Sequence, residues 1–144
     1  MTTPSPATPI THIDPLRNTM LEVHRRLMSL YSALIAAERL TYERIHGRVD
    51  SMDELTQLTL NDSWFTWLSP LSDLLLRIDR LLDDDAFDIT PEIVAHLVAE
   101  VRALTRPSIE GDGFERAYYE ALYRAPDVVL AHFQVTRVLP AKAA

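Results

Sequence analysis

The sequence contains no cysteine in its 144 residues. This absence excludes a disulfide framework, a thiolate zinc site, an iron–sulfur cluster and a cysteine nucleophile. Glycine is scarce as well, since only Gly47, Gly111 and Gly113 are present. The chain therefore lacks a glycine-rich phosphate-binding loop and the frequent glycine turns of an all-β sandwich.

Long hydrophobic runs are also missing, and the run Leu74-Leu75-Leu76 is far too short to span a bilayer. The first nine residues contain neither a basic segment nor an apolar one, so we expect no signal peptide and a cytoplasmic protein.

Positive charge is in deficit, because the chain has 14 basic residues and 21 acidic ones. The net charge of −7 opposes non-specific binding to nucleic acid or to an anionic membrane. Thirteen of the basic residues are arginine, a skew typical of a GC-rich bacterial genome.

What the sequence does contain is the composition of a globular protein, with 47% hydrophobic and 24% charged residues. A chain of this length is expected to form one domain with a real core. Residues 1–13 are rich in proline, threonine and serine, which predicts a disordered N-terminal tail. Residues 14–139 are predicted to form the domain itself.

Apolar residues recur at helical spacing along most of this domain. After an Asp14 N-cap, one long amphipathic helix is predicted to run to Gly47. On its apolar side we expect Leu16, Met20, Val23, Leu27, Leu30, Tyr31, Leu34 and Ile45. Further helices are predicted over 52–60, 64–82 (with a kink or fresh start at Pro70), 91–104, 114–124 and 126–139, although the last segment also alternates like a strand. The predicted fold is an all-α, single-domain bundle of five or six helices.

Two segments in the middle half of the chain, ERLTYERIHGRV at 38–49 and NDSWFTWLSPLS at 61–72, carry a family resemblance. They resemble a family of small, uncharacterised bacterial all-helical proteins. The resemblance implies a bacterial helical protein, and it implies no activity.

Glu38 is the most informative single residue, because the helical wheel places it near the centre of the apolar stripe. An ionised carboxylate in a dry core costs several kcal/mol unless it is paired. We therefore expect Glu38 to be buried beside a polar partner from another helix. Its candidate partners are Arg77, Arg80, Arg102, Tyr118 and Tyr123. The same face could instead line a ligand pocket centred on Glu38, His24, Tyr31 and Tyr42, or form a polar seam at a dimer interface.

Aromatic residues cluster where the third helix begins, at Trp64, Phe65 and Trp67. Trp64 and Trp67 can face one core together, whereas Phe65 then points about 100° away from Trp64. Core packing is one interpretation of the cluster. An interface is the other, because aromatic residues are enriched at the centres of protein interfaces.

No pattern of residues typical of catalysis or metal binding is complete. Ferritin-like di-iron sites require two Glu-x-x-His motifs, and only Glu43-x-x-His46 fits, on the polar side of its helix. No zinc-binding histidine pair and no nucleophile motif is present, so we predict no metal site and no catalytic residues. The cofactor stays unknown, since a single histidine would suffice to bind haem.

An acidic run, Asp83-Asp84-Asp85-Ala86-Phe87-Asp88, follows the third predicted helix, 64–82. It lacks the spacing of a calcium loop, so a solvated loop is expected, with docking of a basic partner as the alternative. Arg77 and Arg80 on the preceding turns are expected to offset part of its charge.

These observations favour a non-enzymatic protein that acts by self-association or by binding a protein partner. We expect a homodimer, because Leu21, Met28 and Ile35 extend the apolar surface of the first helix beyond one narrow stripe. The alternative function is a small-molecule or cofactor pocket between helices at Glu38, His24, Tyr31 and Tyr42.

Overall fold

A computed structural model describes residues 14–84 and 86–141, and this part of the chain consists of seven α-helices with no strand. They are α1 (Pro15–His46), α2 (Met52–Asn61), α3 (Ser63–Thr66), α4 (Ser69–Asp83), α5 (Pro91–Leu104), α6 (Gly113–Arg124) and α7 (Pro126–Val138). The predicted all-α class is confirmed. The expected count of five or six helices was wrong, because the segment from Trp64 to Leu82 forms two helices. The predicted tail at 1–13 lies outside the described residues.

The split between α3 and α4 follows from Pro70. Proline has no N–H to donate and clashes with the preceding turn of a helix, but its fixed φ suits a first turn. The structure accordingly ends α3 at Thr66, passes through a turn at Trp67 and Leu68, and begins α4 at Ser69. The predicted fresh start at Pro70 is confirmed.

Local capping explains where three other helices begin. The side chains of Asp14, Ser51 and Thr90 accept hydrogen bonds from backbone N–H groups in the first turns of α1, α2 and α5, at 3.0, 3.0 and 3.2 Å. The carboxylate of Glu54 accepts its bond from the N–H of Asp50, one residue before the N-cap. The α1 helix ends at Gly47, whose φ of 91° is a conformation that favours glycine.

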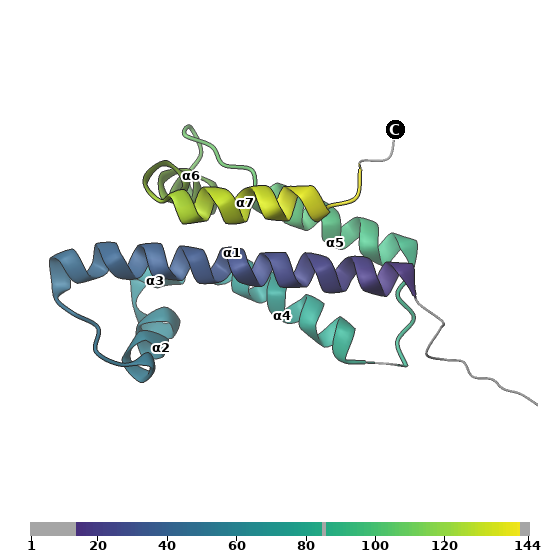
Figure 1. The fold of residues 1–144 in the computed structure, drawn as a ribbon, viewed down its shortest axis with the longest axis horizontal. Helices are drawn as coiled ribbons and strands as arrows, with labels where there is room; N and C mark the ends of the chain where they lie inside the picture. Colours follow the sequence, from purple (N-terminus) through teal and green to yellow (C-terminus); the bar gives the residue numbers. More distant parts are fainter. Residues whose placement is uncertain (1–13, 85, 142–144) are drawn as a thin grey trace, which may run out of the picture.

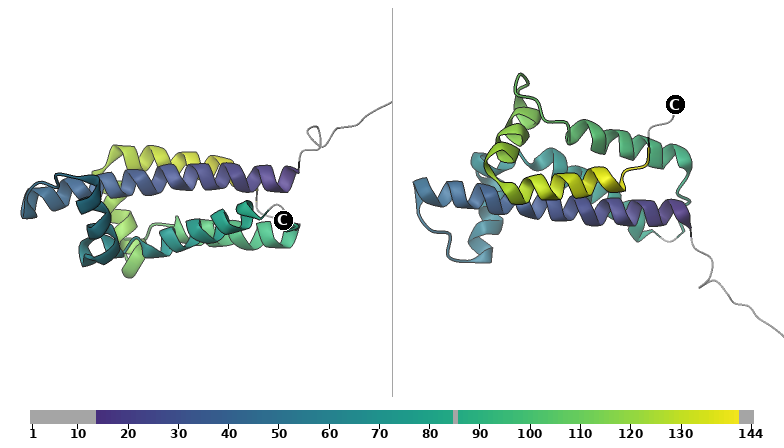
Figure 2. Two further views of the ribbon diagram at one scale, coloured as in Figure 1. Left: turned by 90° about the horizontal axis from the view of Figure 1, so that it is seen from below. Right: turned by 45° about the horizontal axis from the view of Figure 1, so that its top comes forward.

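The α1 helix runs the length of the molecule, and the other helices are arranged around it (Figure 1). The α7 helix lies along one side of α1, α4 and α5 cover a second side, and α6 crosses at one end (Figures 1 and 2). The α2 helix stands off from this body near the C-terminal end of α1, and we call α2 with its two flanking connections the α2 arm.

The apolar residues of α1 lie in the main core, as their spacing predicts. Met20, Val23, Leu27, Leu30 and Leu34 are buried and belong to a cluster of twenty buried residues of the described chain, drawn mainly from α1, α4, α5, α6 and α7. A second, separate cluster beside the α2 arm contains Val49, Leu55 and Phe65.

Ile45 was expected on the buried side of α1, but it is 65% exposed. The last turns of α1 extend past α6 and α7, so the apolar stripe has no helix to pack against there (Figure 1).

At the other end of α1, Arg17 closes the C-terminus of α4. Its guanidinium donates hydrogen bonds to the carbonyl oxygens of Leu82, Asp84 and Phe87 at 2.9, 3.3 and 3.2 Å. A cation at this position opposes the negative end of the helix dipole. Arg77, which was expected to serve the acidic loop, instead binds Glu100 on α5 at 2.6 and 3.0 Å.

Candidate binding groove

An open groove of about 870 Å³ lies between the middle of α1 and α2. A second hollow of about 650 Å³ follows α1 toward its N-terminus, and both are lined by Ser32. The two hollows lie along the same helix and share Ser32, and we call them together the α1 groove. Its α1 residues run from Leu21 to Glu43, and its α2 side is lined by Met52, Leu55, Thr56, Thr59 and Leu60.

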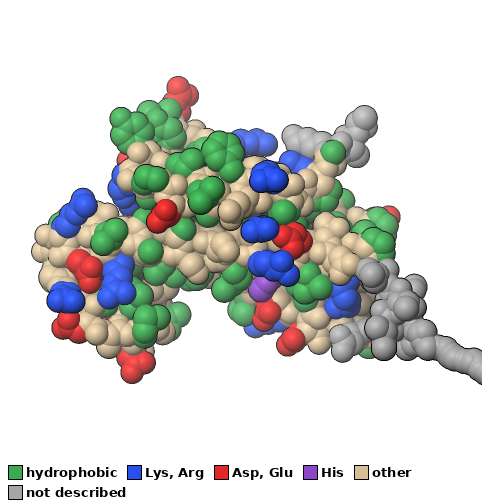
Figure 3. Space-filling view, viewed as in Figure 1, with side chains coloured by type: hydrophobic (Ala, Val, Ile, Leu, Met, Phe, Trp, Pro, Cys, Tyr) green, Lys and Arg blue, Asp and Glu red, His purple; other side chains and the backbone are tan. Residues whose placement is uncertain are grey.

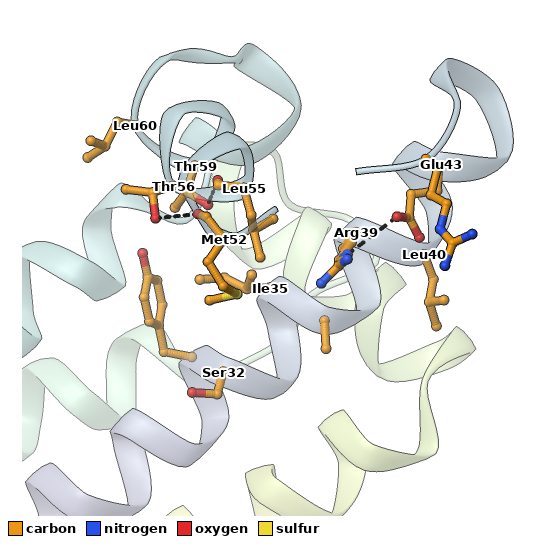
Figure 4. Close-up of a pocket in the computed structure, with 13 residues that line it drawn as sticks. Ser32, Ile35, Arg39, Leu40, Glu43, Met52, Leu55, Thr56, Thr59 and Leu60 are labelled. Carbon is orange, nitrogen blue, oxygen red and sulfur yellow. Dashed lines mark hydrogen bonds and ion pairs between the residues drawn. The ribbon is translucent and has the colours of Figure 1, made fainter. Parts of the chain in front are cut away.

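The floor of the α1 groove is apolar and its rim is unusually exposed. Ile35 points across the groove toward Met52 and Leu55 of the α2 arm (Figure 4). On the rim, Leu40, Met52 and Leu60 are 61%, 70% and 66% exposed. In the space-filling view, the surface is hollowed between the α2 arm and the body, with hydrophobic side chains along the hollow (Figure 3). Concentrated exposed apolar surface is found at protein interfaces, at membrane contacts and in ligand-binding grooves.

Three residues fix the connection that carries the α2 arm. The side-chain carboxylate of Glu43 accepts a hydrogen bond from the N–H of Val49 at 2.8 Å, and Arg39 donates to the carbonyl oxygen of the same residue at 2.8 Å. Arg39 and Glu43 also bind each other at 3.4 Å, one helical turn apart. The bond from Val49, helped by the Arg39 guanidinium, holds the pKa of Glu43 below its usual range. Both backbone groups of Val49 are thus bound by side chains of α1, and the direction of the arm is preset.

A small aromatic cluster supports the base of the arm. Phe65 is fully buried beside Val49, and Tyr42 lies 5.6 Å from its ring. The ring of Trp64 lies nearly perpendicular to the rings of Tyr42 and His46, at 5.8 and 5.5 Å between ring centres. The Nε1–H of Trp64 is buried and has no hydrogen-bond partner among the described residues.

Glu38 lies in a different place, at the junction of α1 with the α3–α4 turn and α6. It is 5% exposed, as its wheel position predicts. Its carboxylate accepts a hydrogen bond from Nε1 of Trp67 at 3.2 Å and pairs with the guanidinium of Arg124. Burial lowers the pKa of Arg124, whose ordinary value is so high that its guanidinium stays charged. The predicted polar partner on another helix is confirmed, although Arg124 is not one of the five candidate partners.

An aromatic layer connects this ion pair to α7. The Trp67 ring packs on Phe114 at 5.3 Å, and Phe114 stacks on Tyr118 at 5.7 Å. The buried hydroxyl of Tyr118 lies 2.7 Å from Nδ1 of His132. Burial raises the pKa of Tyr118 and lowers the pKa of His132, so both groups are neutral near pH 7. This layer fixes how α6 and α7 pack against the α3–α4 turn.

The four residues of the predicted pocket are spread over separate environments. Tyr31 lines the α1 groove, where partial burial raises its pKa. His24 lines the adjoining hollow, with Nε2 3.8 Å from the carboxylate of Asp79. Tyr42 belongs to the aromatic cluster, and Glu38 is committed to Trp67 and Arg124.

If Trp64 and Trp67 faced the core, Phe65 was expected to point away from it, and the structure shows the opposite arrangement. Phe65 is fully buried, whereas Trp64 and Trp67 are half-buried. The wheel argument failed because α3 has only four residues and the chain turns at Trp67, so one helical period does not run through all three positions. Phe65 has no accessible surface to offer a partner.

The groove residues that the sequence analysis missed are mainly Arg39, Leu40, Met52 and Leu60. Among these missed residues, Leu40 could have been noticed on α1, because it is an apolar residue outside the predicted apolar stripe. The α2 residues could not be assigned to a groove before the direction of the arm was known.

No three histidine, aspartate or glutamate side chains in the described ranges are grouped as a metal site. The helices described here include none that is both long and apolar enough to cross a bilayer. Neither a family model, nor a curated protein, nor a solved structure matches this chain.

Proposed function

We propose that this chain is a non-enzymatic interaction module that binds an α-helix of another polypeptide in the α1 groove. The observation that carries the proposal is the groove itself, an open apolar trough with strongly exposed hydrophobic residues on its rim. Amphipathic helices are recognised in this way, with apolar anchors at positions i, i+3, i+4 and i+7 placed in a hydrophobic groove.

The dimensions of the groove fit a helix. Its α1 residues run from Leu21 to Glu43, which at about 1.5 Å per residue gives a length of about 33 Å. Arg39, Glu43 and Arg48 line one end and offer polar contacts beside the apolar floor. Because Val49 is held from both sides, the groove exists before a partner arrives, which lowers the cost of binding.

A small-molecule site is the alternative. The groove volume of about 870 Å³ lies within the usual range of ligand pockets, about 300–1,000 Å³. The version of this hypothesis centred on Glu38, His24, Tyr31 and Tyr42 has less support, because Glu38 is already bound to Trp67 and Arg124.

The proposed setting is the cytoplasm of a bacterium, and it rests on composition alone. Arginine supplies 13 of the 14 basic residues, and cysteine is absent.

A displayed library of amphipathic helical peptides tests the proposed function. The wild-type chain is compared with Leu40→Asp and Leu60→Asp on the rim, and with Ile109→Asp, an exposed residue between α5 and α6, as the matched control. Selected peptides are expected to bind the wild type and Ile109→Asp equally, and to bind each rim variant about tenfold more weakly or worse. Circular dichroism verifies that every variant is folded. If no peptide distinguishes the rim variants from the control, the proposed function is wrong. If a hydrophobic dye binds the rim variants more weakly than the control while no peptide does, the result supports the small-molecule alternative.

A further inference from the structure

We infer that residues 9–13 of this chain dock in an apolar hollow between the first turns of α1, one face of α5 and the segment that follows α7. The hollow is separate from the α1 groove, so the inference does not depend on the proposed function. Three features carry it: the apolar lining of the hollow, an uncharged segment joined directly to its rim, and the advantage of a tethered occupant over a free one. Docking would limit the predicted disordered tail to residues 1–8.

The hollow has a volume of about 480 Å³ and is built by three elements. The N-terminal ends of α1 and α5 lie side by side, and Leu16 and Thr19 of α1 form one wall of the hollow (Figures 1 and 2). On α5, the exposed Ala95 and Ala99 are small and leave the open space. The other lining residues of α5 are Pro91, Val94, Val98 and Arg102. The hollow is therefore an uncovered apolar surface shared by separate elements, and it is not a feature of one helix.

The polar side chains of the lining are already bound within the chain. The hydroxyl of Thr19 donates a hydrogen bond to the carbonyl oxygen of Pro15 at 2.9 Å. The guanidinium of Arg102, the one charged group of the lining, donates to the carbonyl oxygen of Pro140. This bond also holds the segment after α7 against α5, where Pro140 and Ala141 form the third wall. Because the rest of the lining is apolar, an occupant that buries uncharged side chains is favoured over a charged one.

The chain that leads into α1 has the composition that this lining favours. Residues 1–13 lie outside the described residues, and they contain no aspartate, glutamate, lysine or arginine. Ile10 and Ile13 supply two large aliphatic side chains close to Asp14, the N-cap of α1. Because an extended chain spans about 3.3–3.6 Å per residue, Ile10 can reach about 14 Å from Asp14. Thr19 lies about 8 Å along α1 from Asp14, so the hollow begins within that reach.

Covalent attachment favours this segment over an occupant from solution. A free partner loses translational and rotational freedom when it binds, whereas a segment of the same chain has lost most of that freedom already. A segment on a short flexible linker has an effective concentration in the millimolar range. An equally apolar peptide in solution would therefore need to be at about millimolar concentration to displace residues 9–13. For this reason the inference names this segment, and no foreign chain, as the occupant.

Cysteine pairs test the docking directly, because the natural chain contains no cysteine. Ile10→Cys is combined with Ala95→Cys or with Ala99→Cys inside the hollow. At least one of these pairs is expected to form a disulfide within one chain under mild oxidation, because docking brings the two Cα atoms within about 7 Å of each other. The matched control combines Ile10→Cys with His96→Cys, at the next position of α5, which is exposed and lines a different hollow. The control pair is expected to oxidise about tenfold more slowly or worse.

Protection from proteolysis provides the second measurement. Ala99→Trp fills the hollow with a large side chain, and Ala103→Trp, at an exposed position of α5 outside the lining, is the matched control. Proteinase K is expected to cleave within residues 9–13 about tenfold faster in Ala99→Trp than in the wild type, because cleavage follows the population of the undocked segment. Ala103→Trp is expected to leave the cleavage rate unchanged. Circular dichroism verifies that both variants are folded.

Three results would overturn the inference. The first is a control pair with His96→Cys that oxidises as fast as both pairs inside the hollow. The second is equal cleavage of residues 9–13 in the wild type and in Ala99→Trp, which would leave the hollow open to an occupant from solution. The third is a disulfide-linked product of twice the 16.4 kDa of the chain, which would assign the hollow to residues 9–13 of a second copy.

Discussion

The body of the molecule is stabilised by one kind of interaction, and the α2 arm is stabilised by another. The body contains twenty buried residues in one cluster, whereas the cluster beside the arm has three, Val49, Leu55 and Phe65. The arm depends instead on the backbone of Val49, whose carbonyl oxygen accepts a hydrogen bond from Arg39 and whose N–H donates one to Glu43. The difference shows how one short chain can combine a closed core with an open apolar surface.

Burial in the two regions has opposite consequences for binding. In the body, the buried apolar side chains of α1, α4 and α7 cover one another, so these side chains are not available to a partner. In the arm, Met52 and Leu60 face outward, and few buried contacts resist local opening. Segments of this kind open at a lower free energy than the rest of a protein.

Phe65→Ala is expected to give the largest effect that separates the two regions. Removing a buried phenylalanine costs about 3–5 kcal/mol, and here the loss falls on a cluster of three residues. Hydrogen exchange of α2 should accelerate strongly while exchange of α4 and α7 changes little. Leu30→Ala in the body is the matched control, and its cost of about 2–5 kcal/mol should accelerate exchange in all helices. Uniform acceleration in Phe65→Ala would show that the arm and the body open as one unit.

Glu38→Ala is the next largest expected effect, and it tests the polar link inside the body. The change leaves Arg124 and the Nε1–H of Trp67 without their shared acceptor, so urea unfolding should show a loss of about 1–3 kcal/mol. Glu38→Gln should cost less, because an amide oxygen still accepts from Trp67. Glu22→Ala, which removes partly exposed ion pairs with Arg25 and Arg26, should cost about 1 kcal/mol or less. Equal losses for Glu38→Ala and Glu22→Ala would show that the buried pair contributes no more than a surface pair.

A smaller effect is expected from the pH dependence of the body. Burial lowers the pKa of His132, so the unfolded chain binds a proton at a higher pH than the folded chain does. The contribution to stability is therefore fully present above about pH 6.5 and is lost as the pH falls below that value. His132→Gln should flatten the dependence of the free energy of unfolding on pH in this range. His96→Gln, at an exposed histidine on α5, should leave it intact. If the free energy of unfolding of His132→Gln depends on pH as steeply as that of the wild type, another group causes the pH dependence.

The smallest expected effect concerns the acidic loop at the far end of α1. Asp83 is exposed at the C-terminal end of α4, where a carboxylate is unfavourable by a few tenths of a kcal/mol up to about 1 kcal/mol at low salt. Asp83→Asn should raise the melting temperature slightly, and less so at high salt. A fall that is independent of salt would show that this carboxylate has a capping role.

The helices could be predicted from sequence because their signals are local. The caps at Asp14, Ser51 and Thr90 and the glycine at Gly47 act within one turn. The segment 126–139 carried two periodicities, and packing decided between them, since Val128, Ala131 and Val135 are buried in the main core.

The groove could not be predicted, because it depends on where separate elements meet. The position of α2 follows from hydrogen bonds to the backbone of Val49, which no residue pattern reveals. Burial of Glu38 followed from its place on the helical wheel, but its partner Arg124 comes from α6, 86 positions away in the sequence. The direction in which α6 crosses α1 decides that pairing, and the sequence carries no local signal for it.

The packing of α7 along α1 also has a consequence for folding during synthesis. A ribosome delivers α1 first, and the helix that covers one of its sides follows only after the other five helices. Until then, the apolar stripe from Met20 to Leu34 lacks part of its cover and can attract other nascent chains. Contacts between such distant segments also slow folding, because a long loop must close before they form. The apolar stripe of α1 therefore stays partly uncovered in the newly made chain until α7 emerges.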